Sequence, residues 1–140
     1  MEEAPLDSDR IWVLTAEYQA SKASAETHLS LIWQATNIMW AANMVLIGFV
    51  VNAFDKPATL NLVPAIAIFA ILTLLGSTQF TSYYRDVALH EYTRCKEIEN
   101  KLHMARETII PSRRLHLVYL AMNATLISVW LLAFIKSVSG

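Results

Sequence analysis

Residues 31–53 of the chain read LIWQATNIMWAANMVLIGFVVNA and contain no charged side chain. An α-helix needs roughly 20 predominantly apolar residues to cross a hydrocarbon core of about 30 Å. This stretch is long enough, and its only strongly polar side chains are amides. It therefore predicts a transmembrane helix over residues 31–53.

Two further stretches have the same character. Residues 59–79 are also uncharged, and residues 113–136 hold an apolar tract between Arg113-Arg114 and Lys136. Three such tracts in a soluble protein would have to be buried, and a chain of 140 residues has too little polar sequence to cover them. We therefore expect an all-α membrane protein with transmembrane helices at 31–53, 59–79 and 113–136.

The composition agrees with this class of protein. Hydrophobic residues make up 55% of the chain and charged residues 16%, against about 25% charged in soluble domains. The formal net charge is −1, so no basic excess favours a nucleic-acid partner. The single cysteine, Cys95, cannot form a disulfide within the chain.

The positive charges predict an orientation. With three spans, the N-terminal segment and the loop of about residues 80–114 share one side, which carries nine of the eleven Lys and Arg residues. Because positive residues favour the cytoplasm, we expect a cytoplasmic N-terminus and an external C-terminus. The expected anchors at the membrane interface are Trp33, Tyr84, Arg85, Arg113 and Arg114.

The charged segments predict long helices outside the membrane. Apolar or small residues recur at alternating steps of three and four over residues 8–30, and again over 80–110, where Pro111 is expected to end the helix. These helices should extend the first two spans into an antiparallel cytoplasmic hairpin, here called the stalk. Pairing the two seams predicts that Tyr18 lies near Tyr92 and His28 near Tyr83.

No catalytic constellation is evident, and we expect neither an enzyme nor a bound cofactor. Cys95, Glu99 and His103 have a metal-like spacing, but steps of four residues drift about 40° around a helix, so the three do not converge. They are interpreted as a seam cysteine beside a solvated Glu–His pair. His116 is not accompanied by a second membrane-embedded histidine, which disfavours haem.

Polar residues inside the spans are the distinctive feature of the sequence. An amide in lipid is costly unless it is hydrogen-bonded, so these side chains should face protein or water. One interpretation is hydrogen bonding between helices of one subunit, and the other is a polar path lined by several subunits. The candidates are Gln34, Asn37, Asn43, Asn123 and Ser128.

The order of elements resembles that of small bacterial membrane proteins of the SLATT type. The likeness lies in an N-terminal helix, two close spans, a charged helix containing Tyr84-Arg85 and Ile98-Glu99-Asn100-Lys101-Leu102, and then a last span, which is additional to the two-span core of that group. Proteins of this type are found beside antiphage-defence modules. The resemblance implies a membrane-perturbing effector and assigns no role to any residue.

Two functions follow as hypotheses. The first is a non-enzymatic effector that forms homo-oligomers and disrupts or conducts across the bilayer, with a cytoplasmic protein partner acting on the stalk. The alternative is an accessory subunit that scaffolds a larger membrane complex and conducts nothing. A small membrane enzyme is a third, less favoured hypothesis.

Overall fold

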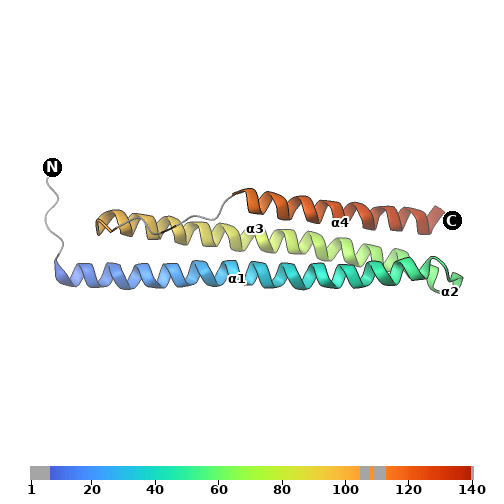
Figure 1. Cartoon of the computed structure of the whole chain (residues 1–140), viewed down its shortest axis with the longest axis horizontal. Helices are drawn as coiled ribbons and strands as arrows, with labels where there is room; N and C mark the ends of the chain where they lie inside the picture. The colour runs from blue at the N-terminus through green and yellow to red at the C-terminus, as the bar shows by residue number, and fades with distance from the viewer. Residues whose placement is uncertain (1–6, 105–107, 109–112, 140) are drawn as a thin grey trace. The chain divides into compact units, whose positions relative to one another are not determined.

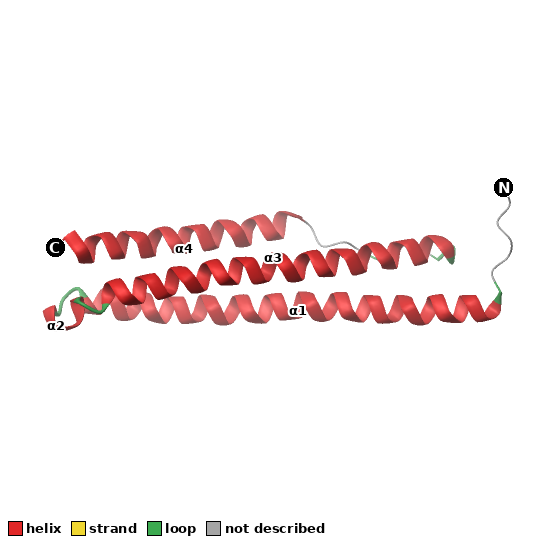
Figure 2. Cartoon of the chain, turned by 180° about the vertical axis from the view of Figure 1, so that it is seen from behind, coloured by secondary structure: helices red, strands yellow, loops and turns green. Residues whose placement is uncertain are grey.

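The structure is a computed structural model that describes residues 7–104, 108 and 113–139. The described residues form helices and connecting loops, with no strand (Figure 2). In chain order the elements, labelled in Figure 1, are α1 (Ser8–Ala53), α2 (Pro57–Leu60), α3 (Val63–Lys101) and α4 (Arg113–Ser139).

Three of these helices are long and apolar enough to cross a membrane. They are α1, α3 and, within α4, residues His116–Ser139. Each contains an 18-residue window with no more than two charged residues. The predicted all-helical chain with three candidate membrane spans is therefore confirmed.

The chain divides into two compact units, and α1 and α3 each contribute to both. Unit 1 comprises the described residues of Met1–Leu31 and Tyr83–Pro111, and unit 2 those of Ile32–Ser82 and Ser112–Gly140. The predicted spans fall mainly in unit 2 and the predicted stalk mainly in unit 1. The two units are described separately below.

Unit 2 has a hydrophobic core made by α1, α3 and α4. Ala67 and Ala70 are fully buried on α3, where their small side chains let a neighbouring helix approach closely. The indole of Trp130 is also fully buried and is the largest side chain of this core. The other buried members are Val50, Ala53, Val63, Leu74 and Leu126.

The outer surface of unit 2 is apolar as well. Large side chains such as Val45 (73% exposed), Leu132 (67%) and Phe69 (61%) lie on it. Contiguous apolar surface of this kind is rare on a protein that is surrounded by water. An apolar outer surface is expected where a protein is surrounded by lipid hydrocarbon.

Unit 1 joins residues of α1 and α3 through a smaller core. Tyr18, Cys95 and Ile98 form this cluster, with Leu14 and Leu102 packed against it. The Arg94 guanidinium forms an ion pair with Glu17 at 2.7 Å, and the two side chains are more than a third exposed. Such a surface pair contributes little, about 0–1 kcal/mol. The buried cluster therefore dominates the packing of this unit.

Contacts between α1 and α3 in unit 1 lie close to the predicted pairs. The His28 ring centroid lies 5.5 Å from that of Tyr84, the neighbour of Tyr83. The Tyr18 hydroxyl donates to Glu99, and the Tyr18 carbonyl oxygen contacts the thiol of Cys95, one turn from Tyr92. The predicted pairs themselves, Tyr18 with Tyr92 and His28 with Tyr83, stay predictions.

α3 ends at Lys101, well before the predicted end at residue 110. His103 has a φ of 51°, in the left-handed region, and its N–H donates to the Asn100 carbonyl oxygen at 3.4 Å. The Met104 N–H donates to the Glu99 carbonyl oxygen at 3.0 Å. These are the two hydrogen bonds of a Schellman motif with His103 at its left-handed position. The motif ends the helix without a proline.

The connection between α1 and α3 contains the single turn α2. Pro57 is at its first position, where a missing N–H costs nothing, and the Thr59 hydroxyl donates to the Lys56 carbonyl oxygen at 3.0 Å. α3 then begins at Val63, with Pro64 tolerated in its first turn. The second long helix therefore starts four residues later than the predicted span at 59.

Candidate functional site

The buried amide of Asn123 joins all three long helices of unit 2. Its Oδ1 accepts a hydrogen bond from the indole N–H of Trp40 on α1 at 3.1 Å, and its Nδ2 donates to the Thr78 hydroxyl on α3 at 2.9 Å. Asn123 itself lies on α4 and is 2% exposed. Both functional groups of this amide are thus satisfied inside one copy of the chain.

Asn43 makes a second connection of the same kind. Its Oδ1 accepts a hydrogen bond from the indole N–H of Trp130 at 2.8 Å, which ties α1 to α4. Its Nδ2 donates to the Met39 carbonyl oxygen at 2.8 Å. Hydrogen bonds between helices in lipid contribute about 0.6–2 kcal/mol each. In the structure, Asn43 and Asn123 therefore make the interhelical contacts that the first interpretation describes.

The remaining candidates for a polar path lie on the surface of unit 2. Gln34 and Asn37 are exposed on α1, three residues apart and so on one face of the helix. Ser128 is exposed on α4, and its hydroxyl donates to the Ala124 carbonyl oxygen at 2.9 Å. A hydroxyl bonded to its own helix can face lipid at small cost, whereas an exposed amide cannot.

The expected interface anchors have mixed environments. Trp33 is 51% exposed, and Arg85 forms a 3.6 Å ion pair with its neighbour Asp86. Tyr84 is half-buried and contacts the rings of His28 and Tyr83. Arg114 is exposed at the start of α4, and the side chain of Arg113 lies outside the described part of the chain. Their role at a membrane interface stays a prediction.

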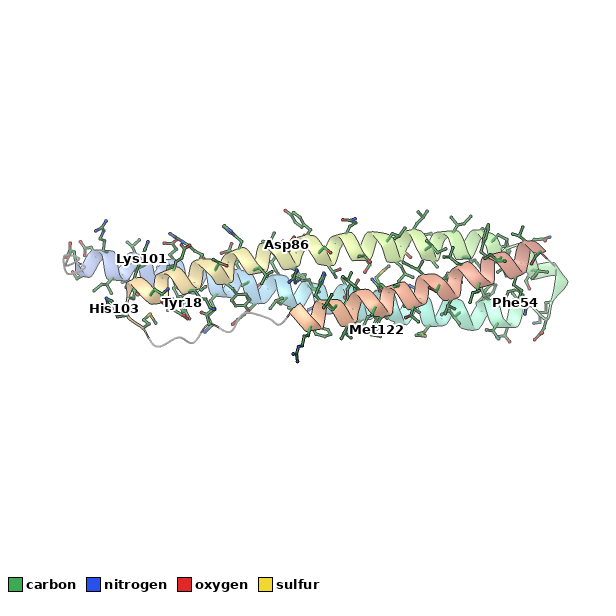
Figure 3. The ribbon with its side chains drawn as sticks, turned by 90° about the horizontal axis from the view of Figure 1, so that it is seen from above. Tyr18, Phe54, Asp86, Lys101, His103 and Met122 are labelled. Atoms are coloured by element: carbon green, nitrogen blue, oxygen red, sulfur yellow. The ribbon has the colours of Figure 1, made fainter. Side chains whose placement is uncertain are left out.

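Unit 1 contains a buried carboxylate, that of Glu99. The side chain is 1% exposed, and its Oε1 accepts hydrogen bonds from the Tyr18 hydroxyl at 3.0 Å and from the Thr108 backbone N–H at 2.9 Å. The Thr108 hydroxyl also contacts this oxygen. Glu99 is not labelled in Figure 3, but the labelled residues Tyr18, Lys101 and His103 mark this part of unit 1.

The interpretation of Glu99 and His103 as a solvated pair is therefore wrong for Glu99. His103 is exposed, but Glu99 points into unit 1, where Tyr18 on α1 and Thr108 contact it. The predicted seam contained Cys95, and Glu99 was expected to lie beside it in solvent. Only the partners elsewhere in the chain show why this carboxylate can be buried.

Cys95 is fully buried beside Glu99. Burial, followed by the nearby carboxylates of Glu99 and Glu91, raises the pKa of its thiol. Its thiol contacts the Tyr18 carbonyl oxygen at 3.8 Å. A thiol that stays protonated is a poor nucleophile and a poor metal ligand. Among the residues that the structure describes, no three His, Cys, Asp or Glu side chains gather in a way that could hold a metal ion.

The end of unit 1 presents apolar side chains to its surface. Trp12 is 73% exposed and Val13 is 56% exposed near the start of α1. Ile11 and Met104 line a shallow hollow with Thr15, Lys101, Leu102 and His103. Trp12 and Val13 follow Ile11 at about 100° steps around α1 and so point in other directions. Exposed tryptophan is enriched where proteins bind one another. The sequence prediction did not include this hollow, whose residues come from the start of α1 and the end of α3.

The tryptophan donors were also missed. Trp40 and Trp130 lie within apolar tracts, where the sequence favours either lipid contact or core packing. A tryptophan buried in an apolar tract needs an acceptor for its N–H, and the sequence offers few besides the asparagines. Which indole meets which amide depends on the offsets between three helices.

Comparisons with models of protein families, with curated proteins and with solved structures found no match to this chain.

Proposed function

We propose that this chain is a non-enzymatic integral membrane protein that assembles with copies of itself and permeabilises the bilayer. The observation that carries the proposal is the exposed amide pair Gln34 and Asn37 on α1. Asn37 lies six residues into the first predicted span, or about 9 Å along the helix. The Asn37 amide needs polar contacts at this depth, and another protein surface or water can supply them.

The interior of a single copy offers no path. Trp130, Leu74 and Val63 are fully buried in unit 2, and Asn43 and Asn123 are occupied by tryptophan donors. A close-packed core of this kind excludes water. A permeation path therefore has to lie between copies, in an assembly that forms through the surface that carries Gln34 and Asn37.

The proposed topology places unit 1 in the cytoplasm as an antiparallel hairpin. Contacts support the direction of pairing, since Glu17 meets Arg94 and the later residue His28 meets the earlier residue Tyr84. The charge distribution supports the orientation, since nine of eleven Lys and Arg residues fall on the side of the N-terminus. The membrane would be a bacterial inner membrane, as the resemblance to SLATT-type effectors implies.

A second candidate function is an accessory subunit that scaffolds a larger membrane complex. The exposed side chains of Trp12 and Val13, and the hollow lined by Ile11 and Met104, favour a protein partner at the end of unit 1. A partner on this patch is compatible with both functions, because an effector also needs a trigger. The two functions differ in what the purified chain does alone.

Reconstitution of the purified chain in dye-loaded liposomes tests the proposal. We expect a homo-oligomer in detergent that releases the dye, and Asn37→Leu should lower the release severalfold without unfolding the chain, because Asn37 is exposed. Ile38→Leu is the matched control on the adjacent lipid-facing position and should leave release unchanged. Equal release by both variants and the wild type would rule out a role for the amide, and a monomer that releases nothing would favour the accessory subunit.

A further inference from the structure

Within unit 2, α1 exposes two faces of different chemistry. One carries large apolar side chains, namely Ile38, Val45 and Phe49, which are 68%, 73% and 44% exposed. The other consists of six exposed residues at alternating steps of three and four, here called the α1 stripe: Gln34, Asn37, Ala41, Met44, Gly48 and Val51. Most members of the stripe are small or polar, and none is charged.

The two faces adjoin each other. Gln34 and Ala41 lie four residues before Ile38 and Val45, about 40° around the helix, whereas Asn37 lies about 100° from Ile38. The large apolar face suits lipid acyl chains. The α1 stripe suits them less, because Ala41 and Gly48 offer little apolar area and the Asn37 amide would lie in hydrocarbon, at a cost of several kcal/mol.

We infer that the α1 stripe is the surface along which α1 of one copy packs against α1 of a second copy. Copies with the same topology in a membrane are parallel, so like residues meet. An amide is both donor and acceptor, so Asn37 can hydrogen-bond to Asn37 of another copy. An uncharged stripe brings no like charges together. The self-complementary amide in parallel copies therefore favours a second copy of the chain as the occupant.

The small members of the stripe allow the close approach that drives helix association in lipid. A Cβ added to Gly48 would meet nothing within 4 Å inside one copy, so the space above this residue is open to a partner. Ala41 lies one heptad earlier. Small residues at a helix interface let two backbones come together and gain dispersion energy.

The spacing of the stripe predicts the geometry of the contact. Alternating steps of three and four average 3.5 residues, which is below the 3.6 of a straight helix and gives a left-handed crossing. In unit 1, α1 shows an exposed, uncharged series with the same spacing: Ala16, Ala20, Ala23, Thr27 and Ser30. The contact between copies thus has a counterpart on the stalk part of α1.

This inference rests on the proposed homo-oligomer, and cysteine cross-linking separates the two. In a Cys95→Ala background, Ala41→Cys places a thiol on the α1 stripe, and Ala42→Cys is a matched control on the next exposed alanine. Both variants are reconstituted in liposomes and oxidised with copper phenanthroline, and the mass of the solubilised particle is measured in parallel. We expect covalent dimers for Ala41→Cys at several times the yield for Ala42→Cys.

The other outcomes each have one meaning. If the particle has oligomeric mass but Ala42→Cys cross-links as well as Ala41→Cys or better, the contact along the α1 stripe is wrong and the homo-oligomer is retained. If the particle has monomeric mass and no cross-links form, both the contact and the homo-oligomer are wrong. If the particle contains a different chain, the α1 stripe binds another partner and the inference is wrong.

A steric pair of variants gives a second test. Gly48→Ile should shift the particle toward the monomer, because a branched side chain fills the space reserved for the partner while fitting one copy. Phe49→Ile changes the adjacent lipid-facing residue and should leave the oligomer unchanged. Retention of the full oligomer by Gly48→Ile would contradict close packing at this residue.

Discussion

The Glu99 carboxylate lies in the interior of unit 1, where an isolated charge would be costly. Its neighbours explain how it is tolerated: Oε1 accepts from the Tyr18 hydroxyl and from the backbone and side chain of Thr108. The sequence could not reveal this, because Glu99 lies beside the predicted heptad seam, where a Glu usually extends into solvent. The partners come from residues 81 and nine positions away.

Removing the tyrosine hydroxyl tests this environment. Tyr18→Phe should destabilise unit 1 by about 1–3 kcal/mol, because a buried carboxylate oxygen loses a donor. Tyr92→Phe is the control, since Tyr92 is also buried in unit 1 but its hydroxyl makes no hydrogen bond with the described residues. Circular dichroism during thermal unfolding in detergent measures both. Equal losses would show that the Tyr18 hydroxyl contributes nothing specific.

The thiol of Cys95 predicts a pH dependence. Burial raises its pKa in the folded protein, so the unfolded chain releases this proton first, at roughly pH 8.5. The stability that this shift contributes is fully present below that pH and is lost as the pH rises above it. Between pH 7.5 and 9.5 the thermal midpoint of the wild type should fall more than that of Cys95→Ala. If the thermal midpoints of the two proteins fell equally over this pH range, the raised pKa of Cys95 would be contradicted.

Among the elements, the sequence predicted the long helices better than their ends. Uncharged tracts indicated three spans, and three helices of sufficient length and apolarity are present. The end of α3 was missed because a Schellman motif with histidine, rather than glycine, at its left-handed position has no strong sequence signal. The contacts between helices depend on axial offsets, which periodicity leaves undetermined.

The end of α3 yields a stabilising substitution. His103→Gly should stabilise the helix end by about 0.5–1 kcal/mol, since glycine adopts positive φ without a steric cost. Asn100→Gly, inside the last turn, should have the opposite sign. Hydrogen exchange of the amides of Leu102 and Met104 reports on both, and slower exchange is expected only for His103→Gly.

Because Asn123 connects the helices of unit 2, its substitution should lower the stability of this unit. Asn123→Leu removes the acceptor for the Trp40 N–H and the donor to Thr78, so unit 2 should lose about 1–3 kcal/mol. Ser128→Ala, on the outer side of α4, removes only a bond to its own helix and should change little. Unfolding in denaturant, followed by tryptophan fluorescence, distinguishes them. If Asn123→Leu left the free energy of unfolding unchanged, the amide would not be a structural link between the helices.

In unit 2 as a whole, apolar and polar surfaces occur together. The outer surface of unit 2 suits lipid, Trp130 is buried in its core, and the exposed amides Gln34 and Asn37 lie on one face of α1. The sequence identified the polar residues, but it could not separate the buried amides Asn43 and Asn123 from the exposed Gln34 and Asn37. That distinction requires knowing which face of α1 meets α4.

All of this depends on the chain crossing the bilayer three times. In a Cys95→Ala background, Ser8→Cys and Ser139→Cys place one thiol near each end of the described helices, for labelling with a membrane-impermeant maleimide. In intact cells we predict labelling of Ser139→Cys alone, and in inverted vesicles labelling of Ser8→Cys alone. Labelling of both thiols from the same side would contradict the account.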